Sequence, residues 1–98
     1  AKAVPSLIPL CHTVVIDRVQ VSATLDEARN SVELEAEASA SGKTGVEMEA
    51  LAAVTSAALT VYDMTKALAK GSVIEAVRLV RKSGGRSGEW RREGEGEE

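Results

Sequence analysis

The chain has 98 residues, of which 44% are hydrophobic and 28% are charged, a balance typical of one folded domain rather than a disordered chain. Its 12 basic and 15 acidic residues give a net charge of -3, which argues against nucleic acid as the main partner. A single cysteine excludes an intrachain disulfide, and a single histidine makes a zinc site improbable.

The first predicted elements are two strands joined by a turn. Residues 1–12 carry Pro5 and Pro9, so they have room for at most one helical turn. Residues 13–25 alternate between apolar and polar side chains, which predicts a half-buried strand. The polar residues 26–30 are typical of a hairpin turn.

The second predicted strand follows that turn and alternates more cleanly. Its inward positions are Val32, Leu34, Ala36, Ala38 and Ala40. The outward side chains Glu33, Glu35 and Glu37 suggest a site for a metal ion or a basic partner. A solvated sheet face accounts for them better, because antiparallel sheets commonly expose one side to water.

Residues 44–70 are predicted to form one long helix. Thr44 and Glu47 have the spacing of a capping box, apolar residues then recur at helical spacing, and Gly71 is the expected stop. A helix of about 26 residues spans ~39 Å. Its many alanines permit another backbone to approach closely, so we expect it to pack on more than its own sheet.

Residues 72–82 are predicted to form a third strand, and the glycine-rich, charged residues 83–98 a flexible tail. The order strand, strand, helix, strand predicts an α+β two-layer sandwich over residues 1–82. Because one helix on so few strands is thin for independent stability, we expect other polypeptide to complete the sheet.

Two short motifs suggest chemistry that their surroundings do not support. Residues 42–44 resemble the end of a nucleotide phosphate loop, but Glu37 stands where that loop needs a glycine. Cys11 and His12 are neighbours, and neighbours on a strand point to opposite faces, which argues against a direct dyad. A buried thiol beside a hydrogen-bonded imidazole, or a histidine that contacts a substrate, both remain open.

The helix carries charged residues near both of its ends. Asp63 and Lys66 share a face, either as a surface ion pair or as a carboxylate and an ammonium placed for acid–base chemistry and phosphate neutralisation. Glu47 and Glu49 lie in the first turn, where the helix dipole favours carboxylates. Asp63 follows Glu49 by 14 residues, or roughly 21 Å along the axis. The two ends can meet only if two copies pack antiparallel, which predicts a composite site between subunits.

Lys82 and Arg86 flank glycines whose backbone amides are able to wrap phosphates. The competing interpretation is a flexible tail without a ligand.

Three segments, 7–12, 43–68 and 77–90, together resemble molybdenum cofactor biosynthesis protein C, the cyclic pyranopterin monophosphate synthase family. The resemblance covers most of 2–90. It implies a ferredoxin-like α+β fold and a homohexamer built as a trimer of dimers. It implies no metal or organic cofactor. With no apolar run long enough for a membrane span and no signal-peptide pattern, we expect a cytoplasmic location without a membrane partner.

The resemblance also implies a reaction and a set of site residues. The family is a lyase that converts a cyclised dihydroguanosine triphosphate into cyclic pyranopterin monophosphate and diphosphate. By motif position, Asp63 and Lys66 match catalytic residues of the family. The substrate-binding positions are Leu10, Cys11, His12, Glu47, Met48 and Glu49, to which the glycine-rich loop adds Lys82 and Arg86.

The chain departs from the family's pattern near its beginning. The family has a further catalytic lysine upstream of Leu7, in a segment that also holds a central first strand, and Lys2 does not match that lysine. Pro5 and Thr13 are also atypical. We therefore expect this polypeptide alone to be catalytically inactive unless another chain supplies the missing part. The alternative is a non-catalytic fragment or degenerate copy that oligomerises through the alanine-rich helix.

Overall fold

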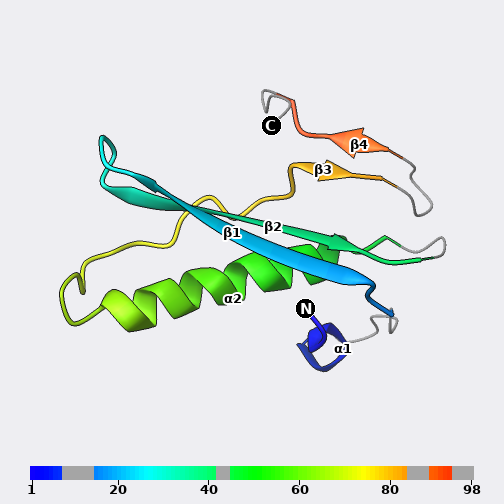
Figure 1. Ribbon diagram of the computed structural model, residues 1–98, viewed down its shortest axis with the longest axis horizontal. Helices are drawn as coiled ribbons and strands as arrows, with labels where there is room; N and C mark the ends of the chain where they lie inside the picture. Colours follow the sequence, from blue (N-terminus) through cyan, green and yellow to red (C-terminus); the bar gives the residue numbers. More distant parts are fainter. Residues whose placement is uncertain (8–14, 42–44, 84–88, 94–98) are drawn as a thin grey trace.

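The computed structural model describes residues 1–7, 15–41, 45–83 and 89–93. Its elements are α1 (Val4–Leu7), β1 (Arg18–Asp26), β2 (Ser31–Ser39), α2 (Glu47–Thr65), β3 (Arg81–Lys82) and β4 (Trp90–Arg91). β1 and β2 form one antiparallel pair, β3 and β4 form another, and α2 runs along the first pair (Figure 1). The architecture is α+β, as predicted, and is consistent with a ferredoxin-like sandwich.

The β1–β2 hairpin confirms the predicted pairing of the two apolar rows, but the prediction that the first strand is half-buried is wrong, because every residue of β1 except Asp26 is exposed. Val19 lies opposite Ala38 and Val21 opposite Ala36, so the apolar rows of both strands share one face. The turn is stabilised by the Arg29 N–H, which donates to Asp26 Oδ1 at 3.1 Å. It closes through Asn30, whose φ of 53° is left-handed, a conformation that asparagine tolerates better than most residues.

The predicted strand over residues 13–25 starts too early, because β1 begins only at Arg18. The Asp17 N–H donates to the Ser39 carbonyl at 2.9 Å, and Ser39 is the last residue of β2. Within the described residues the ladder therefore ends with this bond.

The two faces of β2 have different surroundings. Leu34, Ala36 and Ala38 are half-buried, whereas the glutamates between them are exposed, and α2 contacts this strand. Across the described ranges, no three histidine, cysteine, aspartate or glutamate side chains gather as metal ligands would. The exposure of the glutamate row agrees with the predicted solvated sheet face. No helix in the described part of the chain is long and apolar enough to cross a membrane.

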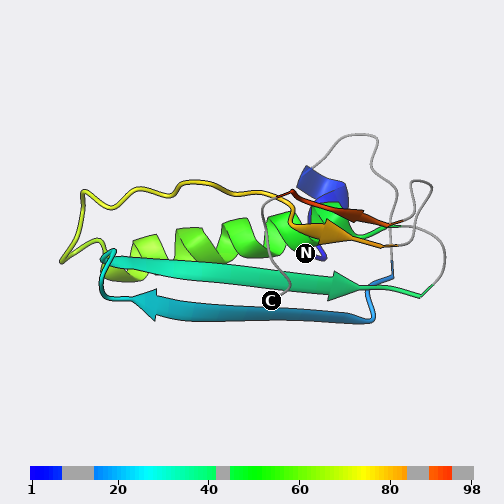
Figure 2. The same cartoon turned by 90° about the horizontal axis from the view of Figure 1, so that it is seen from above.

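The buried apolar core is small. Val4 in α1 is 0% exposed and Ala53 in α2 is 8% exposed, and they are the only buried hydrophobic residues among those described. Figure 2 shows α1 beside the first turns of α2, and the two helices are in contact. In β1, by contrast, every side chain except that of Asp26 is exposed. The two buried hydrophobic residues thus lie in the two helices and not in the first strand pair.

We expect Val4→Ala to lower the free energy of unfolding by about 2 kcal/mol, because it removes two fully buried methyl groups and leaves a void. Urea denaturation followed by circular dichroism measures the change. Val73→Ala is the matched control, since Val73 is 76% exposed. The free energy of unfolding of this variant should stay within about 0.5 kcal/mol of wild type. Equal losses in both variants would contradict this assignment of the core.

The predicted third strand over residues 72–82 is wrong for most of its length. Residues 73–80 have no regular secondary structure, and only Arg81–Lys82 pair, with Trp90–Arg91. Ala76 has a φ of 56°, which interrupts a β conformation. A run of apolar side chains therefore predicted a strand whose hydrogen-bonding partner is not found within the described residues.

The predicted helix limits of 44 and 70 are also wrong. α2 has 19 residues, begins at Glu47 after an uncapped Val46, and ends at Thr65. Thr44 lies outside the described residues. The Glu47 carboxylate lies beside Lys82, and its predicted capping bond to Thr44 stays a prediction. At the other end, the Leu68 and Ala69 N–H groups both donate to the Thr65 carbonyl, so the helix closes in a turn well before Gly71.

Part of the predicted tail has a strand partner. Trp90 pairs with Lys82 and Arg91 with Arg81, so the chain returns along β3 after the glycine-rich segment. Residues 84–88 and 94–98 lie outside the described ranges. The boundary at residue 82 and the flexibility of the tail therefore stay predictions.

Candidate functional site

The N-terminal end of α2 collects two carboxylates and one ammonium. Glu49 is 3% exposed, and Met48 beside it is half-buried. Lys82 Nζ lies 3.6 Å from Glu47 Oε1, and the two side chains are 17% and 34% exposed. An ion pair this sheltered is screened less by water than a surface pair is. The contact joins β3 to the first turn of α2.

Gly45 allows this pair to pack closely against the backbone. A Cβ atom at position 45 would lie 2.5 Å from Glu47 Oε2 and 3.2 Å from Lys82 Cε. Glu47 Oε2 is buried and accepts no hydrogen bond from any described residue. A buried acceptor without a donor is costly, and this oxygen would receive an N–H or O–H group from a ligand only if a rearrangement exposed it.

The other end of α2 carries the second predicted pair. Lys66 Nζ lies 2.8 Å from Asp63 Oδ1, and their side chains are 57% and 69% exposed. A pair this exposed contributes about 0–1 kcal/mol to stability, so the fold does not depend on it. Both groups remain open to a ligand or to another polypeptide.

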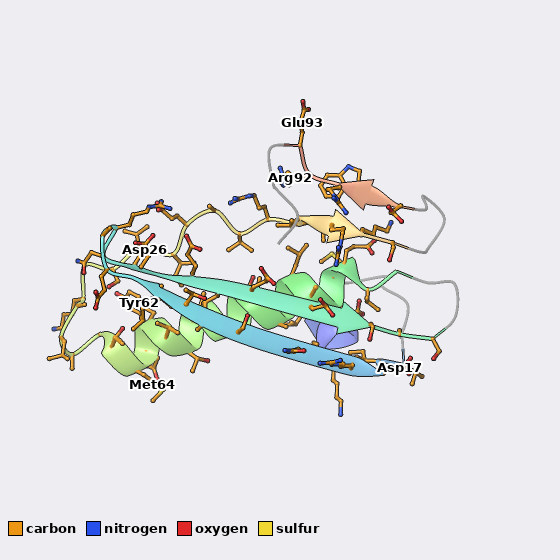
Figure 3. The ribbon with its side chains drawn as sticks, turned by 45° about the horizontal axis from the view of Figure 1, so that its top comes forward. Asp17, Asp26, Tyr62, Met64, Arg92 and Glu93 are labelled. Carbon is orange, nitrogen blue, oxygen red and sulfur yellow. The ribbon has the colours of Figure 1, made fainter. Side chains whose placement is uncertain are left out.

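Tyr62 fixes the backbone around this pair. Its hydroxyl donates to the Lys70 carbonyl at 2.8 Å, which ties the last turn of α2 to the chain that leaves it. Figure 3 shows Tyr62 and Met64 at this end of the molecule, far from Arg92 and Glu93. Asp63 and Lys66 therefore lie in a segment whose two ends, Tyr62 and Lys70, are joined by a hydrogen bond.

The two ends of α2 do not meet within one chain. Both Glu49 and Asp63 belong to the same continuous helix, so they stay roughly 21 Å apart along its axis, as predicted. The composite site between antiparallel copies stays a prediction, since only one copy is present.

Other predicted site residues fall outside the description. Leu10, Cys11, His12 and Arg86 all lie in segments that the structure does not describe. Of the remaining residues, Lys82 and Glu47 are brought together and Asp63 and Lys66 are brought together.

Trp90 and Arg92 were not among the predicted site residues, although they adjoin Lys82 through β4. One feature of the sequence could have indicated them, namely a glycine-rich segment that separates two short runs with basic or aromatic residues. Such a segment is compatible with a hairpin loop as well as with a tail.

Known relatives of the chain agree with the resemblance. A model of the MoaC family matches residues 1–85. A cyclic pyranopterin monophosphate synthase from Roseiflexus sp. (strain RS-1) is 58% identical over 90 residues, which are 92% of this chain and 57% of that protein. The synthase of Pelotomaculum thermopropionicum is 55% identical over 95 residues, or 97% of this chain and 56% of that protein.

A plant relative shows the same similarity within a longer protein. The mitochondrial cyclic pyranopterin monophosphate synthase of Arabidopsis thaliana is 55% identical over 92 residues, which are 94% of this chain and 34% of that protein. The chain thus spans about half the length of the bacterial relatives that it matches. Because the family match covers most of its residues, the chain belongs to the MoaC family.

Proposed function

We propose that the chain contributes to a cyclic pyranopterin monophosphate synthase of molybdenum cofactor biosynthesis. Its substrate would be a cyclised dihydroguanosine triphosphate, and its products cyclic pyranopterin monophosphate and diphosphate. The observation that carries the proposal is the family match over residues 1–85, together with relatives of that name at 58% and 55% identity.

The end of α2 with Asp63 and Lys66 supplies the proton-transfer groups in this proposal. Opening and closing rings at the pterin requires protons to move to and from nitrogen and oxygen atoms. A carboxylate and an ammonium 2.8 Å apart, both open to solvent, are able to accept and donate such protons. The proposal therefore assigns acid–base roles to this pair.

The other end of α2 supplies the binding groups. Glu49 and the unpartnered Oε2 of Glu47 are acceptors for the N–H groups of a purine-derived ring. The Lys82 ammonium, beside Glu47, offers positive charge to phosphate oxygens, which stabilises the departing diphosphate. His12 would hydrogen-bond the base or the sugar, and Arg86 would add charge at the phosphates.

The proposal includes a second copy of the chain as partner, in a dimer and then a hexamer built from three dimers, within the cytoplasm. It includes no metal or organic cofactor, because the roles assigned to the side chains are proton transfer and the binding of ring and phosphate groups. The exposed side chains of β1 favour the alternative function, a non-catalytic assembly module, because they leave apolar residues for other polypeptide to cover.

A reconstitution assay tests the proposal. The purified chain is incubated with the cyclised triphosphate, alone and together with a polypeptide that carries the part of the Roseiflexus relative outside the match. We expect diphosphate release and pterin product only in the mixture. The added polypeptide without the chain is the control.

Each other outcome decides between the functions. Robust release by the chain alone would overturn the expectation that it is incomplete. Binding between the two polypeptides without any turnover would contradict the enzymatic proposal and favour the assembly module.

A further inference from the structure

The β3–β4 hairpin is very short for a strand pair that holds Lys82 next to α2. Each strand has two residues, with Lys82 opposite Trp90 and Arg81 opposite Arg91. Isolated two-stranded hairpins are marginal in water even when they are longer. Contacts beyond these two residue pairs must therefore help to stabilise it.

Arg92 supplies three such contacts. Its backbone N–H donates to the Val80 carbonyl at 2.7 Å, and its side-chain Nε donates to the Leu79 carbonyl, also at 2.7 Å. Its guanidinium carbon lies 5.5 Å from the centre of the Trp90 ring, within range of a cation–π interaction. One half-buried residue thus ties β4 to the chain just before β3, in the part of the molecule where Figure 3 labels Arg92.

These contacts bear on the position of Lys82. Its ammonium is 3.6 Å from Glu47 Oε1, which is longer than a hydrogen bond. A pair at that distance does not by itself fix a flexible lysine side chain. The backbone position of Lys82 is set instead by the hairpin, in which Trp90 is its direct neighbour.

We propose that Trp90 and Arg92 are positioning residues, which hold the β3–β4 hairpin so that Lys82 stays beside Glu47 and meets the phosphates of an anionic ligand. The phosphate part rests on the proposed function. The positional part, Lys82 held next to Glu47, does not depend on any ligand.

The test uses the full chain and inorganic triphosphate as the probe. Trp90 is the only tryptophan, so its fluorescence reports on the hairpin directly. We expect Arg92→Ala to shift this fluorescence and to weaken triphosphate binding about tenfold, because a charge-assisted contact depends steeply on position. Lys82→Ala should weaken binding by a similar factor.

A double-variant cycle separates positioning from direct contact. In a Lys82→Ala background, Arg92→Ala should weaken binding no further, because its effect passes through Lys82. Arg92→Lys should recover part of the affinity, since a lysine keeps a cation near the ring and one donor. Arg29→Ala removes the same charge at the β1–β2 turn, at the opposite end of the molecule, and should leave affinity within about twofold.

The positional part is measured without ligand, as the ¹³C shift of the Glu47 carboxyl group. Arg92→Ala should move this shift toward its value in Lys82→Ala, and an unmoved shift would overturn the proposal. Independent, additive losses of affinity from Arg92→Ala and Lys82→Ala would also overturn it, because Arg92 would then contact the phosphates itself. If the wild-type chain does not bind triphosphate while the carboxyl shift moves as expected, the phosphate role fails and the positioning is supported.

Discussion

Replacing Lys66 with alanine is expected to lower turnover of the cyclised triphosphate by about 10²–10⁴-fold, the range that a positioned acid or base supplies. The fold should not change. Lys66 and Asp63 are exposed and interact only at the surface, so the free energy of unfolding should fall by no more than ~0.5 kcal/mol. Diphosphate release in the reconstituted mixture measures the first effect, and urea denaturation measures the second.

Lys70→Ala is the matched control for this variant. Lys70 is another exposed lysine just beyond α2, and its structural contact is made by its backbone carbonyl, which the substitution retains. Its turnover should stay close to wild type. Near-normal turnover in Lys66→Ala as well would remove Lys66 from the mechanism.

In the reconstituted assay, combining two inactive variants of the chain is expected to restore turnover if the site is shared between antiparallel copies. Glu49→Gln disables one end of α2, and Lys66→Ala disables the other end. In a dimer of one copy of each, one composite site carries both changes and the other is intact. Random mixing makes half of the dimers mixed, so about a quarter of wild-type turnover should return.

A second mixture provides the control for this experiment. Asp63→Asn and Lys66→Ala both alter the same end of α2, so every composite site in their dimers keeps one defect and no activity should return. Failure of the first mixture to recover, with mixed dimers verified by mass spectrometry, contradicts the shared site. Two other results would contradict the shared site. One is a stable, fully active monomer in sedimentation, and the other is a crystal lattice in which Met48 and Lys66 never approach each other between molecules.

The elements predicted well from the sequence are those whose partners are close in the chain. The turn between Asp26 and Ser31, the shared apolar face of β1 and β2, and the body of α2 all follow from local alternation or helical spacing. These patterns determine which residues share a face of a strand or helix without reference to distant residues, but not whether that face is buried, as exposed β1 shows.

The errors arise where distant residues decide the outcome. Apolar side chains on both faces of 73–80 predicted a strand, but a strand also needs a hydrogen-bonding neighbour. The capping spacing at Glu47 gave no indication that its carboxylate lies beside Lys82. A local motif does not reveal a contact with a residue that is distant in the chain.

The candidate site divides in the same way. Asp63 and Lys66 are three residues apart on a helix, so their contact follows from sequence. Lys82 and Glu47 meet only because the chain leaves the far end of α2, runs back and pairs β3 with β4. No spacing rule indicates that contact.

This long return also sets an order of events during synthesis. α1, β1, β2 and α2 make contacts with one another that involve only residues 4–65, and all of these residues leave the ribosome before Lys82 and Arg92 do. We therefore expect a nascent chain to assemble its helix and first strand pair early, with the Glu47 carboxylate still unpaired. Lys82 is synthesised after these elements, so we expect the Glu47–Lys82 ion pair to form late in folding rather than early.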